Sequence, residues 1–352
     1  MPVKLNLLER LAILRWNWTN GTFLDLLSSG AFRAACAAVN LGIFEALGID
    51  ALSSFDVATK AKTDPRATEL LLEALCGFGY MEKESGRYRN SELAKKWLLE
   101  KSPTAQPATT SFYHDILFEL WDSQLEEAIR NGRPSLNFEK WLERDPQRWR
   151  LYMKFSMEIA RWEAPLVVER VKLQTGARTM LDLGGGHGLF SIAFCKKYPG
   201  LSATILDRPG SLDFARETVV KEGAEKQVSF QEGDFIAGNI GQGYDFVLAF
   251  GFLHQYLQTD ILGLFGKVWQ AINPGGLLVI KDEFRDESSW PSRRAWNKFQ
   301  GLNYFTLFGG RTHSFLEVKE WLEKTGFTDV RFIQLPRTVS RLVTAKKVET
   351  RS

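Results

Sequence analysis

The residues whose types and spacing could do chemistry are three aspartates, a glycine cluster and one histidine. Asp182 ends an apolar run and precedes the glycine-rich turn 184–188, whose flexible backbone lets a ligand approach the main chain. Asp207 follows at about 20 residues, the spacing at which an acid meets the hydroxyl pair of a ribose. Asp234 and His254 each follow a later apolar run. The pattern indicates a site for a nucleoside-containing ligand beside an imidazole that could take a proton.

Short apolar segments, separated by helical ones, must position these residues. The predicted strands are Met180–Asp182, Ala203–Leu206, Val228–Gln231, Tyr244–Phe250 and Leu277–Lys281. Strands that alternate with helices form a parallel sheet covered on both faces. Two late strands, Asp329–Gln334 and Arg341–Lys346, have no helix between them and must be antiparallel. The sequence therefore predicts an α/β fold, with a doubly wound, mostly parallel sheet of seven strands and a ligand crevice at their carboxyl ends.

Five motifs carry a resemblance to a known family. They are LDLGGGHG at 181–188, ILDRP at 205–209, EGDF at 232–235, FLHQYLQTD at 252–260 and NPGG at 273–276. From Leu41 to the C-terminus the chain resembles the class I S-adenosylmethionine-dependent methyltransferases. Within that class it is similar to the two-domain O-methyltransferases of small molecules, such as the caffeic acid, acetylserotonin and bacterial polyketide and carotenoid enzymes. The resemblance implies S-adenosylmethionine as cofactor, a small aromatic or polyketide-like acceptor, and a homodimer.

Each part of S-adenosylmethionine needs a partner in the chain. The glycine turn offers backbone contacts to the amino-acid end, and Asp182 can bind its amino group. Asp207 can accept from both ribose hydroxyls, and Asp234 beside Phe235 can take the adenine amino group. The alternative is that the acids only cap turns, but two of them at one sheet edge favour ligand binding. The predicted cofactor residues are Asp182, Gly184, Gly185, Gly186, Asp207, Asp234, Phe235 and Phe250.

His254 is the candidate general base. A lone histidine after a strand is usually structural, but the resemblance implies that this one removes the acceptor's proton. Two glutamates flank the base in the plant enzymes; here Asp282, or else Glu283, takes the first of these positions, and the second falls at Thr312. Asp282 is therefore predicted to orient the base. The other histidines, His114, His187 and His313, are assigned no role.

The acceptor side of the site is predicted from the resemblance alone. Its residues are Met157, Trp162, Trp296, Asn303 and Leu307. The predicted helix Pro146–Arg170 carries an aromatic, methionine-rich stripe, and such a stripe is more often core than pocket. Aromatic and apolar walls nevertheless suit a flat, uncharged acceptor. Arg293 and Arg294 could meet an acidic substituent, but solvated arginines are the more common case.

The chain before residue 106 is predicted to be a separate helical domain. Helices and a hairpin follow in the order of a winged helix: Arg33–Leu47, Ser54–Lys60, a helix opened by Asp64-Pro65, and a hairpin around Ser85-Gly86. Residues 53–100 hold eight basic and eight acidic residues, a balance that favours a dimerisation module over DNA binding. The predicted domains are 1–105 for dimerisation, 106–172 as a helical linker that lines the substrate pocket, and 173–352 for S-adenosylmethionine binding.

Composition limits the remaining possibilities. A net charge of +3, from 45 basic and 42 acidic residues, predicts no strong electrostatic attraction to nucleic acid or to an anionic membrane. Cys36, Cys76 and Cys195 lie far apart, which predicts free thiols and no metal site. No signal peptide and no membrane span are predicted, so a cytoplasmic location is expected. Three alternative functions stay open: carbon methylation, cofactor-bound chemistry without methyl transfer (pericyclic or hydroxylation), and DNA-binding regulation.

Overall fold

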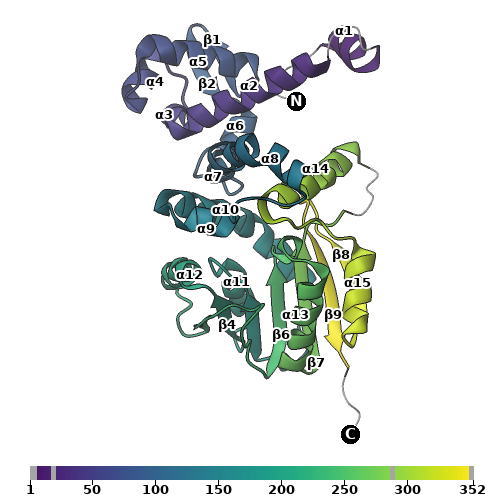
Figure 1. The fold of residues 1–352 in the computed structure, drawn as a ribbon. Helices are drawn as coiled ribbons and strands as arrows, with labels where there is room; N and C mark the ends of the chain where they lie inside the picture. The colour runs from purple at the N-terminus through teal and green to yellow at the C-terminus, as the bar shows by residue number, and fades with distance from the viewer. Residues whose placement is uncertain (1–5, 17–20, 286–289, 349–352) are drawn as a thin grey trace. The chain divides into compact units, whose positions relative to one another are not determined.

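The structure, a computed structural model, describes residues 6–16, 21–285 and 290–348. The chain divides into two units, Met1–Glu119 and Leu120–Ser352 (Figure 1). The first unit is helical apart from one hairpin, and the second is built on a large sheet.

The N-terminal unit contains the predicted winged-helix order. Its helices in the described residues are α1 (Leu7–Arg10), η1 (Leu11–Arg15), α2 (Gly21–Asn40), α3 (Ile43–Leu47), α4 (Ser54–Ala61), α5 (Pro65–Gly77), α6 (Glu92–Trp97), α7 (Pro107–Phe112) and η2 (Tyr113–Phe118). The antiparallel hairpin is β1 (Met81–Glu84) with β2 (Arg87–Asn90). Asp64 caps α5 and Pro65 occupies its first turn, as predicted. Ser85 and Gly86, both with positive φ, form the tight turn of the hairpin.

One helix of this unit was predicted wrongly. The expected helix Arg33–Leu47 is two helices, because α2 ends at Asn40 and α3 begins at Ile43. Gly42 between them has φ +70, a left-handed conformation that glycine adopts without steric cost. The residues on both sides are helical, so the helix is interrupted at this left-handed glycine.

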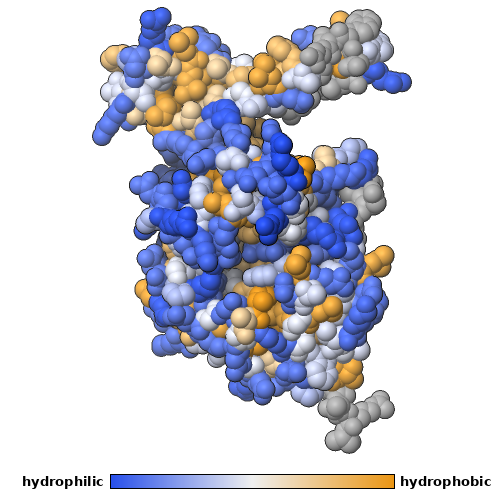
Figure 2. Space-filling model, in the orientation of Figure 1, coloured by the Kyte–Doolittle hydropathy of each residue, from blue (hydrophilic) through white to orange (hydrophobic). Residues whose placement is uncertain are grey.

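Hydrophobic side chains are exposed on the visible face of the N-terminal unit (Figure 2). Large hydrophobic side chains that are at least 48% exposed are Leu7, Leu8, Trp16, Phe23, Leu26, Leu41, Ile49, Phe55, Leu70 and Leu93. Within the described residues, Thr22–Asn40 is also long and apolar enough by composition to cross a membrane, although no such stretch was predicted. Asp25 and Arg33 lie inside it. Apolar surface on this scale indicates a partner surface.

The second unit contains the predicted seven-stranded sheet. Its strands are β3 (Thr179–Leu183), β4 (Ser202–Asp207), β5 (Val228–Glu232), β6 (Tyr244–Phe250), β7 (Ile272–Asp282), β8 (Phe327–Gln334) and β9 (Arg341–Lys347). Their order is β5-β4-β3-β6-β7-β9-β8. The first five are parallel, and β9 runs antiparallel to both neighbours, β7 and β8. The predicted fold class is confirmed.

Helices cover both faces of this sheet (Figure 1). The helices and short turns of the unit are α8 (Glu119–Asn131), α9 (Phe138–Glu143), α10 (Pro146–Arg170), α11 (Leu189–Lys197), α12 (Pro209–Lys221), η3 (Leu253–Gln255), α13 (Gln258–Ala271), α14 (Pro291–Phe308) and α15 (Phe315–Lys324). Alternate strand residues face opposite ways. Met180, Ile205 and Leu248 join a core with α10, α11 and α12, whereas Leu181 and Val247 join a core with α13 and α15. Burial of both faces makes the sheet a rigid platform for the strand ends.

The cysteines are free, as predicted. Cys36 and Cys195 are buried, and Cys76 is half-buried. Burial raises the pKa of the Cys36 thiol to about 12 and that of Cys195 to about 11. Both thiols are therefore protonated and unreactive at neutral pH.

Candidate active site

In the glycine turn between β3 and α11, the backbone packs closely against neighbouring side chains. Gly184, Gly186 and Gly188 have positive φ. A Cβ on Gly185 would lie 2.7 Å from the Asp182 carboxylate, and one on Gly184 would lie 3.2 Å from the Phe235 ring. No larger residue fits at these positions, so the backbone itself forms this surface.

Asp182 is buried under the turn. One of its carboxylate oxygens accepts a hydrogen bond of 2.6 Å from the Ser191 hydroxyl. Burial raises the pKa of this carboxyl to about 7, against the effect of the Ser191 bond. A nearby cation would favour its ionised form.

Asp207 connects the turn to the next strand. Its carboxylate accepts from the backbone N–H groups of Gly186, at 2.8 Å, and Arg208, at 2.7 Å. Burial raises the pKa of Asp207, and these hydrogen bonds act in the opposite direction. The prediction that this acid and the glycine turn come together therefore agrees with the geometry.

Asp234 lies at the same sheet edge as Asp207. Strands β4 and β5 are parallel neighbours, and the N–H of Gly233 donates to the backbone carbonyl of Asp207 at 3.1 Å. Asp234 is exposed, and its Oδ1 accepts from the N–H groups of Ile236, at 2.7 Å, and Ala237, at 3.1 Å. This oxygen thus makes the turn cap that was the alternative interpretation of the residue.

Aromatic rings surround the turn. Phe235 packs on Phe252 with ring centroids 4.6 Å apart, and Tyr256 stands 6.2 Å from both rings. Phe250, at the end of β6, packs edge-on against Phe190 at 4.9 Å. Phe235 therefore offers an aromatic face beside Gly184, whereas Phe250 belongs to the contacts of α11.

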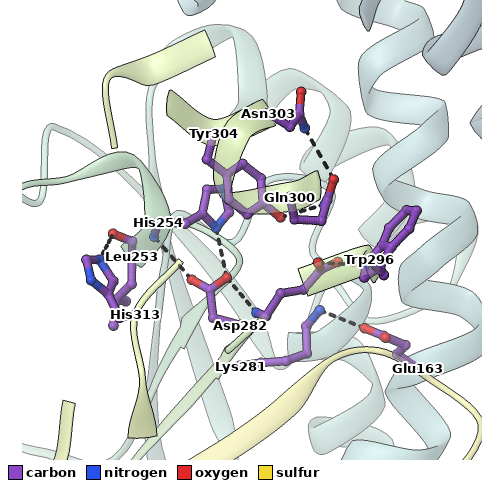
Figure 3. A network of polar contacts seen from close by, with 11 residues as sticks. Glu163, Leu253, His254, Lys281, Asp282, Trp296, Gln300, Asn303, Tyr304 and His313 are labelled. Atoms are coloured by element: carbon purple, nitrogen blue, oxygen red, sulfur yellow. Dashed lines mark hydrogen bonds and ion pairs between the residues drawn. The ribbon is translucent and has the colours of Figure 1, made fainter. Parts of the chain in front are cut away.

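His254 and Asp282 form a buried pair (Figure 3). The Nδ1 of His254 lies 2.8 Å from Asp282 Oδ1, and the backbone N–H of His254 donates to Oδ2 at 3.3 Å. Burial opposes ionisation of Asp282. The charge and hydrogen bond of His254, with the N–H of Glu283, prevail and lower the pKa of the Asp282 carboxyl. An ionised Asp282 accepts a hydrogen bond from the Nδ1–H group, so the neutral ring carries its lone pair on Nε2.

Two of the predicted acceptor residues lie in the polar network around this pair. Trp296 donates to Glu283 at 2.9 Å, and Asn303 donates to Gln300 at 3.4 Å (Figure 3). Burial raises the pKa of Glu283 to about 7, with the Trp296 bond opposing it. Helix α14 therefore presents polar groups beside the His254–Asp282 pair.

The remaining acceptor candidates are more dispersed. Leu307 is buried on α14, and Met157 and Trp162 are half-buried on α10. Thr312, where the resemblance places a second carboxylate, is also buried, and its hydroxyl would stand 3.4 Å from a Cβ on Gly301. Among the described residues, Asp282 is therefore the one carboxylate that contacts His254.

Several residues beside the candidate site were not among the predicted site residues. Met153 is one turn before Met157, and its Cε would lie 4.0 Å from a Cβ built on Gly186. Arg208 pairs with Glu139 at 2.9 Å and Glu143 at 3.0 Å, and so links α9 to the end of β4. The ILDRP motif contains Arg208, so a signal existed for this residue. No local pattern identifies its partners on α9.

A buried ion pair links α10 to the end of β7. Lys281 Nζ lies 2.7 Å from Glu163, and Thr338 donates its hydroxyl to the same carboxylate. Lys281 and Glu163 are 7% and 2% exposed. Because Lys281 precedes Asp282, this pair holds the strand end that carries the partner of His254.

Lys281→Met is expected to lower the free energy of unfolding by about 3 kcal/mol, because it leaves Glu163 buried without its cation. Urea denaturation measures this loss. The matched control is Glu163→Leu combined with Lys281→Met, which should recover at least half of it. If the single and the double variant lose the same free energy of unfolding, the loss comes from packing and not from the uncompensated charge of Glu163.

A doubly wound sheet with a glycine turn and acidic residues at the carboxyl ends of its strands is the arrangement of nucleoside-binding α/β proteins. Two family models match the chain: the O-methyltransferase domain over residues 123–328 and the O-methyltransferase dimerisation domain over residues 25–100. The chain therefore belongs to the O-methyltransferase family, and it is an S-adenosylmethionine-dependent enzyme of that family, as predicted. Within the described residues, no cluster of metal-ligating side chains occurs.

Characterised O-methyltransferases are similar to this chain over most of its length. The 3-hydroxy-5-methyl-1-naphthoate 3-O-methyltransferase of Streptomyces sahachiroi is 26% identical over 323 residues, which are 89% of this chain and 91% of the relative. The acetylserotonin O-methyltransferase of Bos taurus is 28% identical over 311 residues, 84% of this chain and 88% of the relative. The solved human N-acetylserotonin methyltransferase has a TM-score of 0.81 at 23% identity, with 93% of this chain and 97% of that chain covered.

Proposed function

We propose that this enzyme methylates a hydroxyl group of a small aromatic or polyketide-like molecule, with His254 as general base. The observation that carries the proposal is the buried His254–Asp282 pair at the carboxyl ends of β6 and β7. Strand β6 is the direct neighbour of β3, which leads into the glycine turn. A base and a nucleoside site thus share one sheet edge.

The residues of this edge fit S-adenosylmethionine. The glycine turn, where a Cβ on Gly184 or Gly185 would crowd Phe235 or Asp182, would bind the amino-acid end, and Asp182 would bind its amino group. Asp207 would accept from the ribose hydroxyls, while Asp234 and Phe235 would take the adenine. Phe250 would line the edge from the neighbouring strand. When bound, S-adenosylmethionine supplies an electrophilic methyl group on a sulfonium.

His254 would take the acceptor's proton at Nε2. Asp282 holds the ring at Nδ1, which fixes the tautomer and leaves Nε2 as the atom that can take a proton. Full proton transfer from an unperturbed phenol of pKa about 10 to an imidazole near 6.5 costs about 5 kcal/mol. Positive charge in the site favours the developing phenolate and offsets part of this cost.

The rest of the chain supports this site in our proposal. Residues 1–105 form a homodimer through their exposed apolar side chains. Residues 106–172 supply acceptor-lining residues, among them Met157 and Trp162, and residues 173–352 bind the cofactor. Trp296, Asn303 and Leu307 contribute from α14.

Binding of S-adenosylmethionine is expected to strengthen about tenfold between pH 5.5 and 7. The Asp182 carboxyl, with its pKa raised to about 7, is mostly protonated at pH 5.5, and only its ionised form attracts the cofactor's ammonium group. The ammonium group itself stays charged over this range, because an α-amino group has a pKa near 8. Isothermal titration at both pH values measures the change. Asp182→Asn should remove it, and an unaltered pH dependence in that variant would exclude this role.

Transfer of labelled methyl groups tests the reaction. The enzyme is incubated with methyl-labelled S-adenosylmethionine and with 3-hydroxy-5-methyl-1-naphthoate, N-acetylserotonin or a panel of naphthols. Label in a methyl ether that hydriodic acid cleaves supports the proposal. Label that resists cleavage indicates carbon methylation, and substrate conversion without label indicates chemistry in which the cofactor is a spectator.

A further inference from the structure

The face of the His254 ring is covered by Tyr304. The two ring centroids lie 3.6 Å apart, and the planes are inclined by only 16° (Figure 3). The two residues are 7% and 9% exposed, so water does not weaken this contact. Tyr304 comes from α14, 50 positions along the chain from His254, and the roles proposed for His254 and Asp282 do not require an aromatic ring there.

Tyr304 is itself held in place by its own helix. Its hydroxyl accepts a hydrogen bond of 3.1 Å from the side chain of Gln300, one helical turn earlier. Gln300 is 4% exposed and accepts in turn from Asn303. Asn303 also accepts from the indole N–H of Trp121 at 3.1 Å. A tyrosine fixed at its hydroxyl end presents a fixed ring face.

The stack and the carboxylate act on different parts of the imidazole. Asp282 contacts the ring edge at Nδ1, and Tyr304 contacts the ring face. An edge contact alone permits rotation of the ring about the hydrogen bond, whereas a stacked plane prevents it. The electron-rich face of an aromatic ring also attracts a cation more than a neutral group. The contact therefore strengthens when the imidazole gains a proton.

Other charged groups near the pair are the same in every variant of Tyr304. Asp282 and Glu283 come from the end of β7, and His313, whose ring bonds the Leu253 carbonyl, comes from the segment before α15. Arg311 and Glu317 act on His313. The Phe308 ring also lies near the His254 ring, with a centroid distance of 5.9 Å, but the two planes are inclined by 56° and the rings do not stack. A change at residue 304 thus reports on the stacked ring.

We propose that Tyr304 is a positioning residue that fixes the plane of the His254 ring and stabilises its protonated form during catalysis. The proposal rests on the proposed role of His254 as base. The Tyr304 ring would make His254 a stronger and better-oriented base than it would be with the Asp282 contact alone.

Nuclear magnetic resonance of the four histidines tests the stack without an acceptor. The full-length protein is labelled with ¹³C-histidine, His254→Gln assigns the His254 signal, and its titration is followed in Tyr304→Phe and Tyr304→Leu. Loss of the ring in Tyr304→Leu should move the midpoint of this titration down by about half to one pH unit, from the usual strength of a cation–π contact. Tyr304→Phe should titrate as the wild type. An unmoved midpoint in Tyr304→Leu would overturn the proposal.

A second substitution separates electrostatics from packing. Pentafluorophenylalanine at position 304 keeps the ring shape but reverses the charge distribution of its face, so it should shift the midpoint at least as far as leucine does. Leu302→Ala, an exposed position on the same helix, serves as the control and should leave the titration unchanged. A fluorinated variant that titrates as the wild type would overturn the stabilising role.

Turnover connects the stack to the base. With 3-hydroxy-5-methyl-1-naphthoate as probe acceptor, Tyr304→Leu should lower kcat about tenfold while KM for S-adenosylmethionine stays within about twofold. If His254→Gln has full activity, the base assignment fails and the role of Tyr304 fails with it. If His254→Gln is impaired but Tyr304→Leu is not, only the inference about Tyr304 is overturned.

Discussion

His254→Gln is expected to lower kcat about 10³-fold and to leave the Kd for S-adenosylmethionine within about threefold of the wild type. Proton removal by a positioned side chain contributes about 10²–10⁴-fold to a rate. Glutamine keeps much of the side-chain volume but cannot take a proton at neutral pH. The loss should therefore fall on kcat, because the contact with the acceptor's proton matters only as the reaction proceeds. Single-turnover methyl transfer measures it directly.

The control for this prediction is another histidine. His114→Gln, in the N-terminal unit, should have wild-type turnover. Asp282→Asn should be impaired as well, because an amide N–H facing Nδ1 would favour the wrong tautomer of His254. Wild-type kcat in His254→Gln would leave the enzyme class intact and remove the base from its mechanism.

The parts of the site that follow strands were predictable from the sequence. The glycine turn follows β3, Asp207 ends β4 and His254 lies shortly after β6, and parallel strands bring such ends to one edge. The antiparallel pairing of the last two strands also followed, since adjacent strands without a helix between them must be antiparallel. These inferences needed only local patterns and the geometry of sheets.

Contacts between distant segments could not be predicted in this way. Tyr304 lies on α14, and no local pattern of that helix shows that its ring stacks on His254. The pairing of Lys281 with Glu163 joins residues 118 positions apart, and each alone is an ordinary charged residue in the sequence. Such partners are selected by the packing of α10 and α14 against the strand ends, and one sequence does not encode that packing in any local pattern.

Asp207→Ala is expected to raise the Kd for S-adenosylmethionine about 10³-fold, a loss of about 4 kcal/mol. Alanine removes the acceptor for both ribose hydroxyls, and charge-assisted hydrogen bonds contribute about 1.5–3 kcal/mol each. It also removes the carboxylate that the N–H of Gly186 donates to, so the glycine turn loses a fixed contact. Isothermal titration of the purified full-length chain measures this affinity.

The fold is expected to survive this substitution. Burial raises the pKa of Asp207, so its ionised form costs stability once the pH exceeds the value in the unfolded chain. A neutral residue removes that cost at pH 8, in part compensation for the lost hydrogen bonds to Gly186 and Arg208. Near-ultraviolet circular dichroism should therefore match that of the wild type.

Two matched variants rank the acids of the edge. Asp207→Asn retains one acceptor oxygen and should lose less affinity than Asp207→Ala. Asp234→Ala should raise the Kd only about tenfold, because Asp234 is exposed and its Oδ1 is already engaged by Ile236 and Ala237. An Asp207→Ala variant with wild-type affinity and intact fold would mean that the cofactor's ribose is held elsewhere. The sheet edge formed by β3, β4 and β5 would then keep its fold but lose its assignment as the cofactor site.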